Sequence, residues 1–447
     1  MSVATPSGVP PRLSAALQSF EAEFRERSVD PLTRLRDQAM QRVLRLGLPT
    51  TRDETWRYTN LKHIAANSFV EAPLFPPGEF ATTASLSLLS ADARAATVLM
   101  VNGHPSLPSH MDAWFDGIAI RSLRDMARLD PALIAAHLEP LSDAAQARWG
   151  LVNTALFTDG LYLKITENVA TPLVILHMLT GTGADNIAHP RVIIDAARGS
   201  KATIIEHFVE QGAHPPLFNS ATHIHLAENA QLEHYRVFAT SPLAEHIDSL
   251  TIRQQADSVC KQFTIALGGG LVRTTLEASL DQAGASHDSY SLLVGHESRH
   301  VDCVNIVTHN ARDTKSTQTA RAIASGTSRV VFNSKVVVNP GAVRSRSEQS
   351  CRGLLLSRNA EIDTRPQLEI HNDDVKCAHG ATIGRLDPDM LFYLLSRGLD
   401  RETAQSLLVY AFLADVLQGM SVPSARAAIE DALIAQMPDS QLLNEFR

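Results

Sequence analysis

The residue pair best suited to chemistry in this sequence is Cys377 and His379, within the run DDVKCAHGAT at residues 373–382. In a β-strand, residues i and i+2 face the same side, so the thiol sulfur and an imidazole nitrogen would lie next to each other. This combination of ligands suits iron or zinc. Two ligands are only half a metal site, however, and the more frequent arrangement is a buried thiol beside a hydrogen-bonded histidine. The residues alone leave both alternatives open.

The other histidine pair and the other cysteines are predicted to be structural. His223 and His225 share the i, i+2 spacing, but the intervening residues are suited to the core, so the histidines are predicted on the solvated outer face of a strand. Cys303 lies in a strand-like run where a small buried residue packs well. Cys260 and Cys351 have no partner nearby at ligand spacing, which predicts that they pack in the core.

Several enzyme motifs are absent from the sequence. There is no Gly-x-x-x-x-Gly-Lys-Ser/Thr loop, so the chain is not expected to bind or hydrolyse a nucleotide. Gly268–Gly270 lacks the lysine that such a loop requires, and it is predicted to be a turn. There is no Gly-x-Ser-x-Gly elbow and no His-Glu-x-x-His helix, which argues against a conventional hydrolase.

Length and composition narrow the class of protein. The chain has 447 residues, which favours about three structural units, and 44% of them are hydrophobic, enough for a large core. The net charge of −8 argues against nucleic acid as a partner. No apolar run is long enough to cross a membrane, and the N-terminus does not resemble a targeting segment, so a cytoplasmic protein is predicted. The four cysteines are too widely spaced for a disulfide framework.

Residues 1–150 are predicted to form a helical N-terminal region. Apolar residues recur at helical spacing from Arg12 to Phe24. A second helix is predicted over residues 30–46, with Asp30 as its N-cap and Gly47 just after its end.

Residues 151–384 are predicted to form an extended β region. Short runs of β-branched and alternating residues recur there, separated by small or polar turns such as those beginning at Gly199, Asn229 and Gly284. This loose repetition fits either a β-solenoid or a large sandwich, and the solenoid is favoured.

Residues 385–447 are predicted to form a helical C-terminal domain, because apolar residues there again recur at helical spacing. Asp387 and Asp400 are suited to cap two successive helices, and a third is predicted over residues 421–437. The apolar faces of these helices are broad, so they are expected to pack on the β region, on a partner, or on both.

Several of these segments together resemble the SufD family of the SUF iron–sulfur cluster assembly machinery. The similar segments, in the order and spacing of that family, are Glu54–Thr59, Val336–Ala342, Asp374–Gly384, Leu391–Leu399 and residues 404–412. The Lys-Cys-x-His-Gly-Ala-Thr form at Lys376–Thr382 is of the SufD type rather than that of the related subunit SufB. One departure is His371, where an aromatic residue is expected.

The resemblance implies a mainly β fold, with a right-handed parallel β-helix core flanked by N-terminal and C-terminal helical domains. It also implies a non-enzymatic scaffold that pairs with a SufB-like homologue and a SufC-like ABC-type ATPase. The two β-helix subunits would share a transient iron–sulfur cluster, with His379 as a candidate ligand at the SufB interface and Cys377 as a weaker one. A reduced flavin is a candidate cofactor of the complex, and the isolated chain is a candidate homodimer.

The C-terminal helices are expected to dock the ATPase, because their apolar faces are broader than one packing face requires and they lie at the end of the solenoid. The candidate docking residues there are Leu391, Tyr393, Leu394, Leu407, Leu408 and Phe412. Two other functions stay open: a polysaccharide-acting β-helix enzyme, for which only the pair Asp373 and Asp374 offers neighbouring carboxylates, and a purely structural interaction module.

Overall fold

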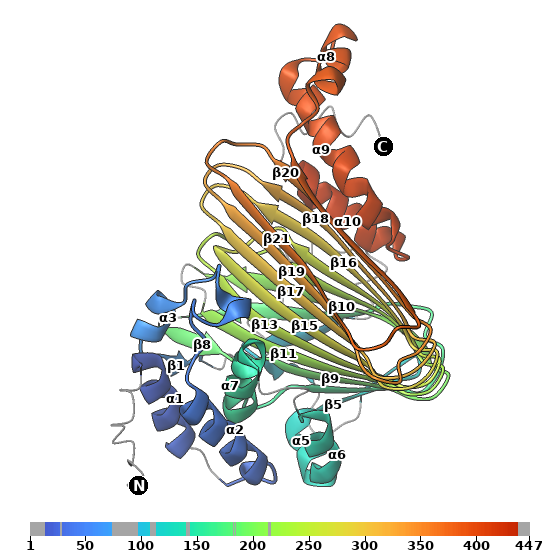
Figure 1. The fold of residues 1–447 in the computed structure, drawn as a ribbon. Coiled ribbons are helices and arrows are strands. Elements are labelled where there is room, and N and C mark those ends of the chain that lie inside the picture. Colours follow the sequence, from blue (N-terminus) through green and yellow to red (C-terminus); the bar gives the residue numbers. More distant parts are fainter. Residues whose placement is uncertain are drawn as a thin grey trace, which may run out of the picture.

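The computed structural model describes residues 14–26, 29–73, 97–107, 113–139, 144–181, 183, 185–212 and 216–436. These residues form a β-solenoid of about seven turns with helices at both ends of the chain (Figure 1). The predicted mainly β fold with a β-helix core is therefore confirmed, and the sandwich alternative is wrong. Arg12 and Leu13, at the start of the first predicted helix, and Met437, at the end of the last one, lie outside the described residues.

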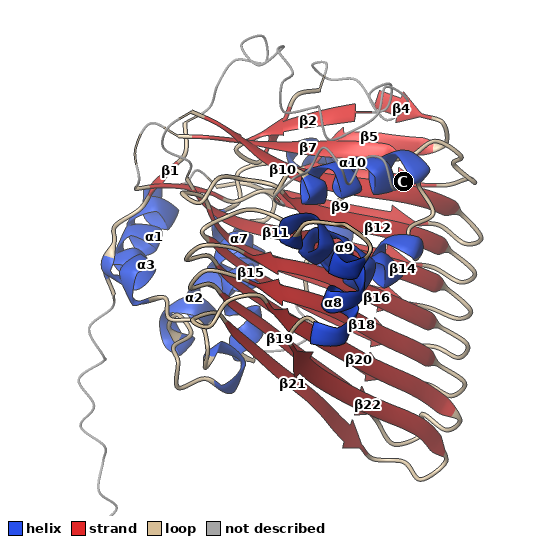
Figure 2. Cartoon of the chain, turned by 90° about the horizontal axis from the view of Figure 1, so that it is seen from above, coloured by secondary structure: helices blue, strands red, loops and turns tan. Residues whose placement is uncertain are grey.

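From β9 onward, successive strands alternate between two sheets, and neighbouring strands of the core are parallel (Figure 2). The first sheet contains, in spatial order, β21 (Glu361–Ile370), β19 (Arg329–Val338), β17 (His300–His309), β15 (Leu271–Leu280), β13 (Glu245–Gln254), β11 (Leu217–Leu226), β9 (Arg191–Ala196), β6 (Leu161–Ile165), β5 (Ile118–Ser122) and β4 (Ala113–Phe115), with β8 (Asn186–Ala188) beside β11 and β1 (Val70–Glu71) beside β8. The second sheet contains β22 (Val375–Gly384), β20 (Ser345–Leu355), β18 (Lys315–Ala324), β16 (Ser286–Gly295), β14 (Val259–Ala266), β12 (Gln231–Phe238), β10 (Lys201–Gln211), β7 (Leu173–Thr180), β2 (Thr97–Val101) and β3 (His104–Pro105).

The turns between rungs repeat one conformation. Gly199, Asn229 and Gly284, which the sequence placed in turns, have positive φ angles of 70°, 60° and 76°. Glycine and asparagine tolerate this left-handed region better than other residues. The backbone N–H of each donates to a carbonyl oxygen in the turn of the next rung, as Gly199 does to Glu228. The turns therefore stack in register with the strands.

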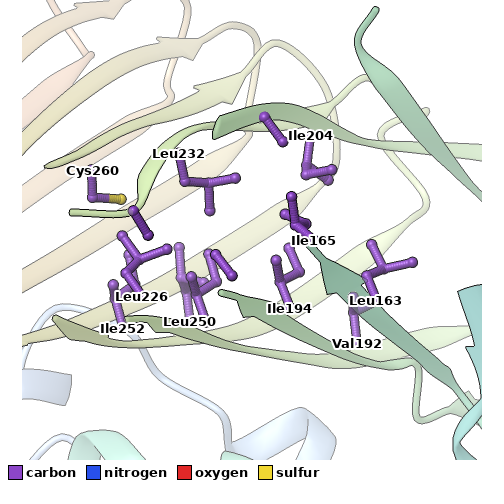
Figure 3. Close-up of a cluster of buried hydrophobic side chains, with 14 of the residues drawn as sticks. Leu163, Ile165, Val192, Ile194, Ile204, Leu226, Leu232, Leu250, Ile252 and Cys260 are labelled. Atoms are coloured by element: carbon purple, nitrogen blue, oxygen red, sulfur yellow. The ribbon is translucent and has the colours of Figure 1, made fainter. Parts of the chain in front are cut away.

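Part of the solenoid interior at its N-terminal end is filled by an apolar cluster. Leu163, Ile194, Ile204 and Leu250 point from the two sheets into one buried cluster, and Cys260 lies at the side of this cluster (Figure 3). Alternate residues along each strand supply these side chains, as the period of two requires.

Helices from the first part of the chain cover the outer face of the first sheet, and short strands from the same part extend the two sheets. The helices are α1 (Ala15–Glu26), α2 (Thr33–Leu46), α3 (Lys62–Ala66), α5 (Leu123–Leu129), α6 (Pro131–His137) and α7 (Arg148–Leu156), with 3₁₀ turns η1 (Glu54–Trp56) and η3 (Ala145–Ala147). Strands β1 to β5 were not predicted within this region, and two of them, β2 and β5, pair with β7 and β6. The N-cap prediction at Asp30 is wrong: Asp30 and Pro31 lie in a turn before α2, and the Asp30 carboxylate accepts from the N–H of Leu32.

The segment around Trp56 attaches the N-terminal region to the solenoid. The guanidinium of Arg273, on β15, lies 4.4 Å from the centre of the Trp56 ring and donates to the Thr55 carbonyl at 2.8 Å. Its Nη1 donates to the Asp302 carboxylate on β17 at 3.0 Å, and the Thr59 hydroxyl donates to the same carboxylate. Arg273 and Asp302 are fully buried, so their charges depend on these contacts.

The C-terminal helices are α8 (Pro388–Ser396), α9 (Arg401–Gln418) and α10 (Pro423–Ile434). The predicted caps are confirmed, since the carboxylates of Asp387 and Asp400 accept from backbone N–H groups in the first turns of α8 and α9. Apolar side chains of α9 and α10, including Leu413, pack in one cluster with side chains of the second sheet. Among the described helices, none combines the length and the apolar character needed to cross a membrane.

We expect Arg273→Met to destabilise the chain by roughly 3–5 kcal/mol, because it leaves the Asp302 carboxylate buried without its cation. Thermal or urea unfolding of the isolated chain measures this. Arg198→Met is the matched control: Arg198 pairs with Glu228 at the surface, where an ion pair contributes about 0–1 kcal/mol. Equal, small effects of both substitutions would contradict the role of Arg273.

Candidate functional site

Cys377 and His379 lie on β22, the final strand of the second sheet. β22 pairs with β20 on one side and with no described strand on the other, and β21 ends the first sheet in the same way. Figure 2 shows both strands at the free edge of the two sheets. The two candidate ligands are therefore placed at the open C-terminal end of the solenoid.

The strand pairing sets the direction of both side chains. Cys377 is the register partner of Ser347, and His379 is the partner of Gln349, both of which are buried on β20. Cys377 is half-buried and packs against the interior cluster around Val336. His379 lies two residues further on the same side of the strand but is exposed, because no rung covers it. The predicted same-side arrangement of the pair agrees with this geometry.

His379 does not have the environment of a structural histidine. Its side chain is exposed, and the imidazole makes no hydrogen bond to any residue that the structure describes. Burial raises the pKa of the Cys377 thiol, although a backbone hydrogen bond from Ser347 opposes this. Since the thiolate is the form that binds metal, the imidazole of His379 is the better ligand of the two.

The described residues do not contain a complete metal site. Nowhere in them do three or more histidine, cysteine or acidic side chains lie where they could hold one ion. Cys377 and His379 offer two ligands at an open end, and an iron or zinc ion bound there needs further ligands from another molecule.

Two neighbouring features of the C-terminal motif are also at the surface. His371 follows β21 and lies 3.0 Å from the Glu369 carboxylate, so its departure from the expected aromatic residue alters an exposed position. Asp373 and Asp374 are exposed in the bend before β22. Nothing in their surroundings supports a glycosidase-type pair of carboxylates.

The other three cysteines are buried, as predicted. Burial raises the pKa of Cys303 to about 11 and that of Cys351 to about 12, and it also raises the pKa of Cys260. These thiols are therefore protonated at neutral pH and serve as packing groups.

His223 and His225 lie on the outer face of β11, as predicted, but the prediction that they are solvated is wrong. Both are half-buried and line a cavity of about 600 Å³ that is partly covered by α6. The Asp195 carboxylate accepts from Lys164 at 2.6 Å and lies 3.7 Å from His225. Burial would raise the pKa of Asp195, but hydrogen bonds from His137, His225 and Lys164 lower it.

The structure also contains a buried ionic network that no sequence pattern indicated. Glu206, on β10, accepts at 2.9 Å from each of His177, His234 and Arg236 inside the solenoid. Arg236 also donates to Asp248 on the facing sheet. These groups come from strands far apart in the sequence, and all are buried, so the network joins the two sheets rather than forming an accessible site.

The candidate docking residues differ in their exposure to solvent. No residue of α8 is buried; Tyr393 is 55% exposed and the neighbouring Phe392 is 72% exposed. The other candidates are half-buried, and they are Leu391, Leu394, Leu407, Leu408 and Phe412. The ring of Phe412 lies 6.0 Å from the Arg321 guanidinium of the second sheet. The free apolar surface of the C-terminal helices is therefore on α8.

Comparison with known proteins agrees with this architecture. Residues 178–412 match the family described as the SufBD core domain of the SUF system for FeS cluster assembly, and residues 13–175 match the SufBD protein N-terminal region. The chain is 31% identical to the iron–sulfur cluster assembly protein SufD of Escherichia coli, over 92% of this chain and 94% of that one. It is 27% identical to an iron–sulfur cluster assembly SufBD family protein of Synechocystis, over 87% of each chain, and 22% identical to SufD of Bacillus subtilis, over 92% and 95%. The chain therefore belongs to the SufBD family of SUF-system iron–sulfur cluster assembly proteins, within which it is of the SufD type.

Proposed function

We propose that the chain is a non-enzymatic scaffold subunit that holds a nascent iron–sulfur cluster at the open end of its β-helix, together with a SufB-like homologue. The observation that carries this proposal is the placement of His379: an exposed imidazole, without a partner among the described residues, on the last rung of the solenoid. A SufC-like ATPase docks on the C-terminal helices and supplies the energy that the chain itself cannot draw from ATP.

The open end is suited to a partner of the same architecture. Each inner rung satisfies its backbone N–H and C=O groups through the rungs on either side, whereas β21 and β22 lack a described neighbour on one side. Unpaired strand edges favour the addition of further strands. Ile370 and Ile383, on these strands, are 41% and 43% exposed and add apolar contact area. A second β-helix would continue both sheets, and a second copy of this chain would fit in the same way when the partner is absent.

The chemistry of the two ligands suits a cluster that is passed on. A neutral imidazole binds iron, and it releases iron more readily than a thiolate does. Because Cys377 and His379 provide at most two ligands, the partner supplies the others. A cluster held across an interface is exposed to transfer whenever that interface opens.

The docking of the ATPase is assigned mainly to α8. The inner faces of α9 and α10 pack on the second sheet, but α8 extends beyond it with Met390, Phe392 and Tyr393 exposed (Figure 1). Aromatic side chains of this kind are frequent anchors of protein interfaces.

We expect His379→Ala to reduce the rate of cluster formation in the reconstituted complex by at least about tenfold, since loss of even an outer-shell partner of a metal lowers affinity 10–100-fold. The melting temperature of the isolated chain should stay nearly unchanged, because exposed substitutions usually change stability by less than about 0.5 kcal/mol. His371→Ala, at another exposed histidine, is the control. A wild-type rate with His379→Ala would refute the ligand role.

The double substitution Phe392→Ser with Tyr393→Ser should weaken binding of the ATPase by roughly 2 kcal/mol or more, as expected for central aromatic anchors. Titration of the purified ATPase against the full-length chain measures the change in Kd. Leu243→Ser is the control, because Leu243 is 69% exposed on a different part of the molecule. Undiminished binding by the double variant would exclude α8 as the docking element.

We expect ATP to change the reactivity of Cys377 toward a thiol-labelling reagent in the assembled complex, because movement of docked ATPase subunits would open the interface that covers it. The other three cysteines are buried, so labelling of the folded chain reports on Cys377. The isolated chain, tested with and without ATP, is the control and should show no difference. Equal labelling rates in the complex while ATP is being hydrolysed would contradict the opening step.

A further inference from the structure

A column of polar side chains runs through the solenoid interior and ends at His379. Its members are register partners on five successive rungs of the second sheet: Gln262 (β14), Ser289 (β16), Gln318 (β18), Gln349 (β20) and His379 (β22). All but His379 are buried. The C-terminal rungs therefore present a continuous row of hydrogen-bonding groups to the interior, and this row leads to the open end.

Gln349 is the least satisfied of the buried members of this column. Its side chain is on the inward face of β20, between exposed Glu348 and half-buried Ser350, and the residue is only 2% exposed. Neither its Oε1 nor its Nε2 has a hydrogen-bond partner among the residues that the structure describes. A buried polar group left unpaired costs about 1–3 kcal/mol, so an orphaned amide in a native core calls for an explanation.

The position of Gln349 supplies that explanation. It lies directly beneath His379 in the strand register, at one strand spacing, about 4.8 Å. Gln318 lies one rung deeper, about 10 Å from His379 on the same spacing. The Gln318 amide also differs from that of Gln349 in having a hydrogen-bond partner: its Nε2 donates across the interior to the Lys335 carbonyl at 3.4 Å. Of these two amides, Gln349 is the one that is both adjacent to the open end and wholly unpaired.

We propose that Gln349 is a positioning residue of the cluster site, whose Nε2 donates a hydrogen bond to inorganic sulfide of a cluster held by His379. This inference rests on the proposed function. The ligand class follows from the chemistry of the amide. Its oxygen is a hard ligand that favours magnesium, calcium or manganese, so it does not compete with imidazole and thiolate for iron. Its N–H groups are neutral donors, and hydrogen bonds to cluster sulfurs tune the reduction potential and hold the cluster in place.

The test uses Gln349→Met, which keeps the length of the side chain but removes both polar atoms. In the isolated chain without iron, the melting temperature should stay the same or rise, because an unsatisfied amide has been removed from the core. In the reconstituted complex, the amounts of iron and acid-labile sulfide retained should fall by roughly tenfold, as for an outer-shell partner, and the visible absorption bands of the remaining cluster should shift. Gln318→Met is the matched control and should leave both the cluster content and the spectrum unchanged.

Each result decides between the possible roles. Wild-type cluster content and spectrum with Gln349→Met, while His379→Ala loses the cluster, would overturn the role of Gln349 and leave the proposed function standing. A melting temperature several degrees lower in the isolated Gln349→Met chain would show that the amide serves folding, and this would also overturn it. Equal losses with Gln318→Met would indicate a general need for a polar interior rather than a specific hydrogen bond. Retention of the cluster by His379→Ala would instead refute the proposed function itself.

Discussion

The parallel pairing of each rung with the next is the interaction on which the rest of the structure depends. Backbone groups inside a protein must find hydrogen-bond partners, and in this fold the preceding and following rungs supply them. The pairing extends without interruption from β10 to β22 in the second sheet. Among the described strands, the pairing stops at β21 and β22, whose outer edges keep unpaired backbone groups. The C-terminal end of the solenoid is therefore well suited to bind another molecule.

The turns and the helices both serve this stacking. Residues with positive φ at the corners, such as Asn229, let each turn donate a hydrogen bond to the next, which keeps the rungs in register. The Trp56 segment lies over β15 and β17, where the buried Arg273 and Asp302 join it to two rungs at once. Helices α9 and α10 cover the outer face of the second sheet. The main apolar surface left free is then on α8 and at the open end.

The site at the open end is incomplete in a way that matches a scaffold for transient cargo. A resident metal centre is usually enclosed, with its ligands and their supporting hydrogen bonds supplied by one chain. Here Cys377 is half-buried and His379 is exposed, and the amide of Gln349 lies beneath them without a described partner. An incomplete set of ligands such as this one is completed by a partner molecule. When the partner moves away, its ligands leave with it, and the cluster can be released.

The amino-acid sequence was enough to predict the class of fold, the helix caps at Asp387 and Asp400, and the shared side of Cys377 and His379, because these depend on local periodicity and on short-range hydrogen bonds. Its motifs, in their order and spacing, also identified the family. The folded chain was needed to show that β22 is the last rung, that Gln349 lies beneath His379, and that α6 partly covers His223 and His225. A period of two shows which side a residue faces, but it does not show which strand lies opposite or what covers that face. Those depend on contacts between residues far apart in the chain, and the register of such contacts is set by the packing of the whole solenoid.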